Sequence, residues 1–238
     1  MAFAHSSRVK LTPRAAARFP GETLFDRIGR AVCTADCLPR KELYESWELA
    51  RRARRRFRGG RVVDLACGHG LVAHLMLVLD DTSESALAID TRLPASAPKL
   101  AAALTARWPR LAGRVTFEER PLDEVALDAG DVVVSAHACG ALTDRVLERA
   151  VAARARVVVL PCCQDEATCD PGGFEGWVDA SLAIDMTRAA RLRASGYAIY
   201  TQRIPEAITP KNRLLMAEPR ELAGAERADT ARGGEVAT

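Results

Sequence analysis

The sequence predicts an α/β fold built on a largely parallel sheet, and three observations support this. From residue 61 onward, short apolar segments rich in β-branched residues alternate with longer segments of helical periodicity. The apolar segments show little polar alternation, which is typical of strands covered on both faces by helices. The last two segments, 197–204 and 212–218, have only a short connection between them, which favours an antiparallel pair.

Each element follows from its own residue pattern. Seven apolar segments are predicted to be strands: "RVVDLAC" (61–67), "ALAID" (86–90), "RVTFEER" (114–120), "DVVVSAHA" (131–138), "ARVVVLPCC" (155–163), "YAIYTQRI" (197–204) and "NRLLMAE" (212–218). Four helices are predicted between them, at 71–79, 98–108, 142–152 and 174–195. Two more are expected before the first strand, at 22–32 and at 41–57, with Gly59-Gly60 ending the second one.

These elements suggest three parts of the chain. Residues 1–60 are expected to form a basic helical extension that packs on the main domain and contributes to a substrate lid. Residues 61–220 are expected to form the α/β domain. The tail, 221–238, is rich in alanine, glycine and charge, and is expected to be disordered.

Composition favours a cytoplasmic protein with reduced cysteines. The chain has 238 residues, 48% of them hydrophobic, and no apolar run approaches the roughly 20 residues that a membrane span needs. The N-terminus is rich in arginine but lacks the apolar core of a secretion signal. Seven cysteines, an odd number, are expected to be buried, catalytic or metal-binding rather than bridged.

The charge distribution is uneven. Residues 1–60 carry 14 Lys and Arg against 6 Asp and Glu, whereas the remainder is net acidic. The excess is concentrated in "RRARRRFR" (51–58). Its six arginines could attract a polyanion such as RNA, or could form a solvated helix face; they are Arg51, Arg52, Arg54, Arg55, Arg56 and Arg58.

The segment "VVDLACGHG" (62–70) is the first candidate site. Ligands of open α/β sheets bind beyond the carboxyl ends of the strands, and this segment leaves the first predicted strand. Gly68 and Gly70 permit a tight turn and a close approach of the backbone to a ligand. Asp64 could orient the turn or contact the ligand. Asp90 ends the next strand and could accept hydrogen bonds from the ribose hydroxyls of an adenosine.

Two cofactor classes are compatible with this segment alone. The dinucleotide fingerprint tolerates Ala73 at its third glycine position, so the motif leaves a nicotinamide cofactor open. However, the pattern D-x-x-x-G-x-G, the acid after the second strand and the terminal hairpin resemble the class I S-adenosylmethionine-dependent methyltransferases over about residues 60–218.

This resemblance implies both a fold and a cofactor site. The fold would be a Rossmann-like seven-stranded sheet with strand order 3-2-1-4-5-7-6, its last strand antiparallel, preceded by the helical extension. The cofactor would be S-adenosyl-L-methionine. The implied cofactor-binding residues are Asp64, Ala66, Cys67, Gly68, Gly70 and, on the ribose, Asp90.

A second cluster is expected at the ends of the fourth and fifth strands. "SAHACGALTD" (135–144) follows the fourth strand and "LPCCQDE" (160–166) the fifth. In the implied strand order these strands are neighbours and the fourth lies beside the first, so their carboxyl ends share one rim with Cys67 and His69. Because successive strand residues point to opposite sides, only one of Cys162 and Cys163 would face the cleft if the strand ran through both.

These segments carry a narrower resemblance. "HACGALTD" and "LPCC" look like the H-x-C-G-x-x-x-D and C-C pair of two methyltransferase groups. One comprises the tRNA 2′-O-methyltransferases that modify position four of the acceptor stem, and the other is the methyltransferase domain of glutathione S-transferase C-terminal-domain-containing proteins. "TPKNRLLMAE" (209–218) resembles their last-strand segment. The zinc-finger segments of the tRNA enzymes have no counterpart in this sequence.

The cluster is open to several chemistries. His137 could act as general base on a hydroxyl or amine. A cysteine could attack the substrate covalently, as in RNA cytosine-5 methyltransferases, although their acidic residue before the first cysteine is absent. The ligand types also suit zinc, but H-x-C and adjacent C-C are poor structural-zinc spacings, so no metal is expected. Alternatively, the cysteines could serve packing alone. The candidate catalytic residues are His137, Cys139, Cys162 and Cys163.

The resulting prediction is a methyltransferase with an unidentified acceptor, for which the basic N-terminal region favours RNA. The alternatives are transfer to a small molecule or a protein, and a cofactor-binding module without catalytic activity.

Overall fold

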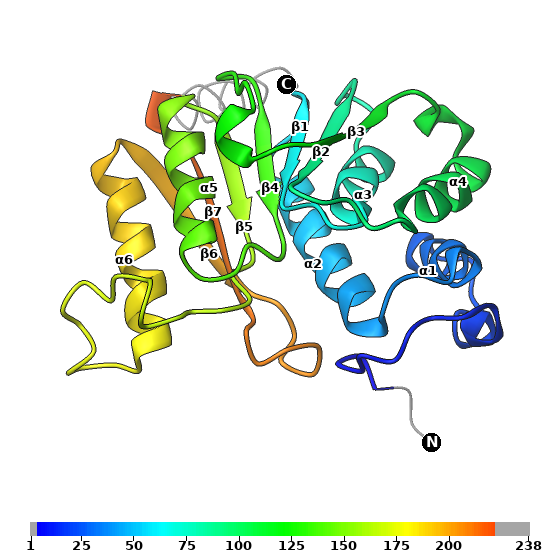
Figure 1. Cartoon of the computed structure of the whole chain (residues 1–238), viewed down its shortest axis with the longest axis horizontal. Coiled ribbons are helices and arrows are strands. Elements are labelled where there is room, and N and C mark those ends of the chain that lie inside the picture. The colour runs from blue at the N-terminus through cyan, green and yellow to red at the C-terminus, as the bar shows by residue number, and fades with distance from the viewer. Residues whose placement is uncertain (1–3, 222–238) are drawn as a thin grey trace, which may run out of the picture.

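A seven-stranded sheet organises the chain (Figure 1). The structure, a computed structural model, describes residues 4–221. The strands are β1 (Val62–Leu65), β2 (Ala86–Asp90), β3 (Val115–Glu119), β4 (Val132–Ser135), β5 (Arg156–Val159), β6 (Tyr197–Arg203) and β7 (Arg213–Pro219). Their order is β3-β2-β1-β4-β5-β7-β6, and β7 runs antiparallel to both of its neighbours. The predicted strand order and antiparallel last strand are confirmed.

Helices cover both faces of this sheet. They are α1 (Leu24–Ala35), α2 (Arg40–Arg56), α3 (Leu71–Leu79), α4 (Ala97–Arg107), α5 (Ala141–Ala152) and α6 (Ala180–Ala194), with 3₁₀ turns at Pro13–Arg18, Pro109–Leu111 and Leu122–Glu124. One core joins the first four helices to strand residues such as Val62 and Val132. A second joins α5 and α6 to the alternate residues, such as Val63 and Val133. The valine runs of β1 and β4 therefore bury side chains on both faces, as expected for parallel strands between two helical layers.

The first sixty residues share the core of the sheet. Leu43, Leu49 and Phe57 are fully buried and belong to the same cluster as Val62. Helix α2 packs along α3, and α1 packs along α4. A domain boundary at residue 60 stays a prediction, and the predicted disordered tail lies, beyond Glu221, outside the described residues.

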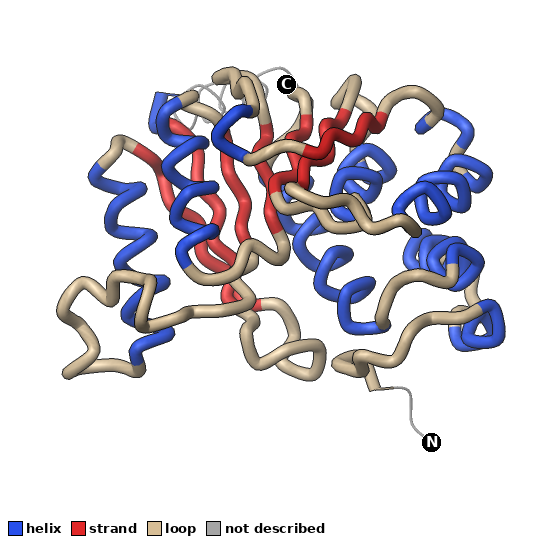
Figure 2. Tube along the Cα trace, viewed as in Figure 1, coloured by secondary structure: helices blue, strands red, loops and turns tan. Residues whose placement is uncertain are grey.

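Several elements are shorter than their sequence patterns predicted, and three of them affect the site. β5 ends at Val159, because Pro161 has no N–H with which to continue the ladder. β4 ends at Ser135 rather than at residue 138. The long segment from β5 to α6 is loop (Figure 2), and α6 begins only at Ala180, where the Asp179 carboxylate caps the helix by accepting the Leu182 N–H.

None of the helices within residues 4–221 has the length and apolar character of a membrane-spanning segment.

Candidate functional site

The loop between β1 and α3 forms a sharp turn at the centre of the sheet. β1 pairs with β2 on one side and β4 on the other, so its carboxyl end is flanked by both. Ala66, Gly68 and Gly70 all have positive φ, at 58°, 52° and 71°. The Gly70 N–H donates to the Cys67 carbonyl at 2.8 Å, which closes the turn before α3 begins.

Gly68 and Gly70 meet different surroundings. A Cβ on Gly70 would lie 2.6 Å from the Phe117 ring, so this position needs glycine for packing as well as for backbone conformation. A Cβ on Gly68 would meet no atom within 4 Å. The turn therefore has a tightly packed side at Gly70 and an open side at Gly68, where a ligand could approach the backbone.

Asp90 lies beside the turn and binds the backbone of Gly68. Its Oδ2 accepts the Gly68 N–H at 2.9 Å, while Oδ1 receives two long contacts, from the Arg92 N–H at 3.4 Å and the Thr91 hydroxyl at 3.5 Å. Because each carboxylate oxygen can accept two hydrogen bonds, Oδ2 keeps acceptor capacity, and Oδ1 is engaged only by these long contacts. The structure thus brings together Gly68 and Asp90, which the sequence placed on two different strand ends.

Asp64 lies beneath the turn. Its carboxylate is buried, and Oδ2 accepts the Ala73 N–H in the first turn of α3 at 3.1 Å. Burial raises the pKa of Asp64 to about 7, and the nearby Asp90 adds to the increase. Its visible contact is therefore with the protein backbone, which ties the end of β1 to α3.

Cys67 and His69 complete the loop. The Cys67 N–H donates to the Ile89 carbonyl at 2.9 Å, which links the loop to β2, and burial raises the pKa of the Cys67 thiol. The His69 Nε2 lies 2.9 Å from the Ser96 hydroxyl, next to the start of α4. Both side chains are half-buried at the edge of the turn.

The predicted cysteine cluster forms at the ends of β4 and β5. The Cys139 and Cys162 sulfurs are 3.1 Å apart, and the Cys162 and Cys163 sulfurs are 3.8 Å apart. The expectation that only one of the adjacent cysteines faces the cleft rested on a strand running through both. Since β5 ends at Val159, that condition is not met, and Cys162 and Cys163 line the same pocket.

This pocket, of about 420 Å³, also receives residues from α2 and the N-terminal segment. It is lined by Arg8, Pro39, Lys41, Glu42, Glu45, His137, Cys162 and Cys163. The start of α2, the loops after β4 and β5 and the β6–β7 turn all lie at the same end of the molecule (Figure 1). We call it the Glu45–His137 pocket.

His137 and Glu45 face each other in this pocket. The His137 Nε2 is 3.9 Å from the Glu45 Oε2, and within residues 4–221 this buried nitrogen has no hydrogen-bond partner. Burial lowers the pKa of His137 to about 4, and Lys41 contributes in the same direction. Burial raises the pKa of Glu45, against the opposing effect of Lys41, whose Nζ lies 3.2 Å from Oε1.

Glu42, Glu45 and Lys41 were not predicted as site residues. Burial raises the pKa of Glu42 to about 7, with Glu45 as a second cause. In sequence, "KELYE" has the polar composition of a solvated helix face. Only the packing of α2 beside the ends of β4 and β5 turns these side chains inward, so no local signal identified them.

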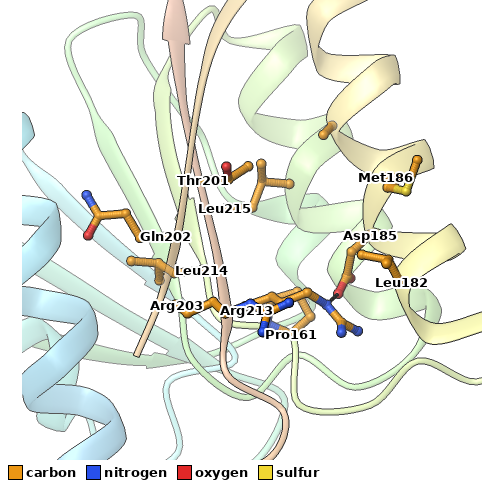
Figure 3. A pocket seen from close by; sticks show the side chains of 11 residues that line it. Pro161, Leu182, Asp185, Met186, Thr201, Gln202, Arg203, Arg213, Leu214 and Leu215 are labelled. Atoms are coloured by element: carbon orange, nitrogen blue, oxygen red, sulfur yellow. Dashed lines mark hydrogen bonds and ion pairs between the residues drawn. The ribbon is translucent and has the colours of Figure 1, made fainter. Parts of the chain in front are cut away.

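A second pocket of about 420 Å³ lies between α6 and the β6–β7 pair (Figure 3). Two of its charged groups pair with each other, since the Asp185 carboxylate accepts the Arg213 Nε–H at 2.7 Å. Leu182, Met186 and Leu215 give it an apolar lining. The Glu45–His137 pocket, with an unpartnered buried nitrogen, therefore has the stronger claim to polar chemistry.

The arginine-rich segment is largely engaged inside the molecule. Arg54 is buried, and its Nη2–H donates to the Ser83 hydroxyl at 2.7 Å. Arg51 and Arg52 pair with Glu48, and Arg56 pairs with Glu218. Arg55 and Arg58 are exposed. RNA binding through this segment stays a prediction, with two of its six arginines pointing to solvent.

Comparison of the sequence with known protein families identifies the family to which this chain belongs. Residues 41–170 match a family model described as a methyltransferase domain. The matched range contains all of α2 but its first residue, together with the β1–α3 loop, Asp90 and the cysteine cluster. No curated protein matches the chain in sequence.

Solved structures share the fold. An O-methyltransferase family protein from Burkholderia thailandensis has a TM-score of 0.51 at 18% identity, covering 88% of this chain and 63% of that one. A putative O-methyltransferase from Nostoc punctiforme has a TM-score of 0.50 at 14% identity, covering 86% and 66%. This chain spans less than two thirds of the length of the Burkholderia protein.

Proposed function

The chain belongs to a family of methyltransferase domains, and from that premise we propose that it transfers a methyl group from S-adenosylmethionine to an acceptor bound in the Glu45–His137 pocket. The observation that carries the proposal is the turn at Gly68, which is open on one side and whose backbone N–H is bound by the Asp90 carboxylate. This is the arrangement expected where a backbone must approach an adenosine closely.

The residues present fit this cofactor. Asp90 keeps acceptor capacity for ribose hydroxyls, and Gly68 leaves the space that a side chain would fill. Asp64 holds the turn in place from below. When bound, the cofactor supplies the methyl carbon and its sulfur leaving group. The carboxyl groups of Asp64 and Asp90 suit the positive charge of the cofactor's sulfonium group.

The acceptor side of the proposed site lies at the ends of β4 and β5. Transfer requires the acceptor atom to be held in line at about 3–3.5 Å, and an acceptor hydroxyl or amine must lose a proton. The His137 Nε2 is a buried nitrogen free to accept a hydrogen bond from such a group, and Glu45 Oε2 lies opposite it. Lys41 balances the charge of Glu45.

We further propose that RNA is the acceptor. With this goes the proposal that the chain is related to the tRNA 2′-O-methyltransferases and to the methyltransferase domain of glutathione S-transferase C-terminal-domain-containing proteins. These proposals are supported by the convergence of His137, Cys139 and the adjacent cysteines at one rim, and by the exposure of Arg55 and Arg58.

The experiment is methyl transfer from tritiated S-adenosylmethionine to separate pools of RNA, protein and metabolites. We expect label in one pool, with transfer lost in Asp90→Ala and kept in Asp128→Ala, a control at an exposed acid away from the loop. Label in protein or metabolites alone would eliminate RNA. Cofactor binding without transfer to any pool would contradict the enzymatic proposal and favour a binding module.

A further inference from the structure

Three cysteine thiols converge on one point at the rim of the Glu45–His137 pocket. The sulfurs of Cys139, Cys162 and Cys163 all lie within 4.8 Å of one another. Cys139 and Cys163 are exposed and Cys162 is half-buried, so these side chains do not fill the hydrophobic core. Packing therefore does not account for their position.

The backbone holds the two cysteine-bearing loops together. β4 and β5 are hydrogen-bonded neighbours, with Ser135 opposite Val159. Beyond the strands, the Leu160 N–H donates to the Ser135 carbonyl at 3.0 Å and the Gly140 N–H to the Cys163 carbonyl at 3.2 Å. The thiols are thus presented by a fixed scaffold, which a ligand site requires.

The sulfur spacings suit a single tetrahedral ion. Zinc–thiolate bonds of about 2.3 Å place tetrahedral sulfurs about 3.8 Å apart. The Cys162–Cys163 separation is 3.8 Å, and the shorter Cys139–Cys162 separation is 3.1 Å. The sequence argued against a metal because H-x-C and adjacent C-C are poor spacings for structural zinc. In the structure β5 ends at Val159, before Pro161, and the two adjacent thiols reach one cluster with Cys139.

The adjoining pocket carries charges of both signs. Glu42 and Glu45, on α2, line it together with Arg8 and Lys41. A divalent ion bound to the three sulfurs would stabilise them as thiolates.

We propose that Cys139, Cys162 and Cys163 bind one zinc ion through three thiolates, with its fourth position open to the Glu45–His137 pocket. Three Zn–S bonds replace three S–H bonds, and three protons pass to solvent. Three protein ligands and an open position are the arrangement of catalytic rather than structural zinc. This site goes beyond the proposed function, and its metal binding is measured without the methyl donor.

The test is metal binding by the reduced full-length chain. We expect one zinc per chain by elemental analysis, and Co²⁺ substitution should give thiolate charge-transfer absorption in the near ultraviolet. Cys139→Ser, Cys162→Ser and Cys163→Ser should each weaken zinc binding by at least about 100-fold, since even partners outside the ligand set contribute about 10–100-fold. Cys37→Ser is the matched control and should bind as wild type, because its thiol lies outside the cluster.

The wild-type protein alone keeps the proposal testable where a variant does not fold. Zinc should protect three thiols from a thiol-specific reagent, and a chelator should expose them again. Absence of bound zinc with all thiols reduced, unchanged affinity in the cluster variants, or a Cys139–Cys162 disulfide as the stable state in reducing buffer would overturn the site. None of these outcomes bears on cofactor binding at Gly68.

Discussion

Gly68 and Gly70 have the same left-handed backbone but different surroundings, which separates a ligand-facing role from a packing role. Gly68→Ala should cost about 1–2 kcal/mol of folding stability from backbone strain alone. Gly113→Ala is its matched control, with φ of 72° and open space around the new Cβ. Only Gly68→Ala should also weaken S-adenosylmethionine binding, because its methyl group enters the open side of the turn.

Gly70→Ala should be more destabilising than either, since its Cβ meets the Phe117 ring at 2.6 Å. Urea unfolding gives the stabilities and calorimetry the affinities. Equal cofactor affinity in Gly68→Ala and Gly113→Ala would contradict a ligand at Gly68.

The buried Asp64 predicts a pH dependence of stability. Its pKa is about 7 in the folded chain, against 3.8 for the free side chain, mainly because of burial. The folded state therefore binds more protons between these values, and this residue's contribution falls as pH rises from about 4 through 7. Asp64→Asn removes this dependence while keeping an oxygen for the Ala73 N–H.

The melting temperature of Asp64→Asn should accordingly rise relative to wild type between pH 5 and pH 8, without ligand. Any constant cost of the buried amide cancels in this difference. If the melting temperatures of Asp64→Asn and wild type changed with pH by the same amount across that range, Asp64 would not titrate there.

Sequence could locate these loop residues because their signal is local. A β-branched run followed by Asp64 and two close glycines marks a strand end, and Asp90 marks the next. Glu45 could not be located, since its place beside His137 depends on how α2 packs. The shared orientation of Cys162 and Cys163 depended on where β5 ends, which the proline at 161 decides.

At the level of elements, α2 is anchored to α3 by Arg54, which the sequence pattern assigned to a charged surface. The Arg54 Nε–H donates to the Met76 carbonyl of α3 at 3.0 Å, and Nη1 is 3.3 Å from the buried Asp80 carboxylate. Six arginines in eight residues predicted a surface patch. Composition cannot distinguish a buried member from its exposed neighbours.

Arg54→Ala should destabilise the protein by about 1.5–3 kcal/mol, because it removes a charged hydrogen-bond donor to the Met76 carbonyl and one of the two guanidinium partners of the buried Asp80 carboxylate, the other being Arg58. Arg55→Ala, one residue away and exposed, should change stability by less than about 0.5 kcal/mol. Urea unfolding of both variants measures the difference. Similar values would mean that Arg54 does not anchor α2 to α3.

On the scale of the whole molecule, strand order decides which loops can form a site. Placing β1 between β2 and β4 brings the turn at Gly68 next to Asp90 on one side and to the loop of His137 on the other. Alternation of apolar strands and helices predicted a largely parallel sheet, and the short connection between the last two strands predicted their antiparallel pairing. The strand order itself was implied by the resemblance to class I methyltransferases. The helices of residues 1–60 complete the same core, so the Glu45–His137 pocket is built jointly by α2 and the loops that follow β4 and β5.

The most direct measurement is calorimetric titration of S-adenosylmethionine into the wild-type chain and Asp90→Ala, with Asp128→Ala as control. The account predicts one molecule bound per chain by wild type and by the control. In Asp90→Ala affinity should fall roughly 10–100-fold, as expected for lost hydrogen bonds to a charged acceptor. Equal affinity in Asp90→Ala, or no binding by the wild-type chain, would contradict it.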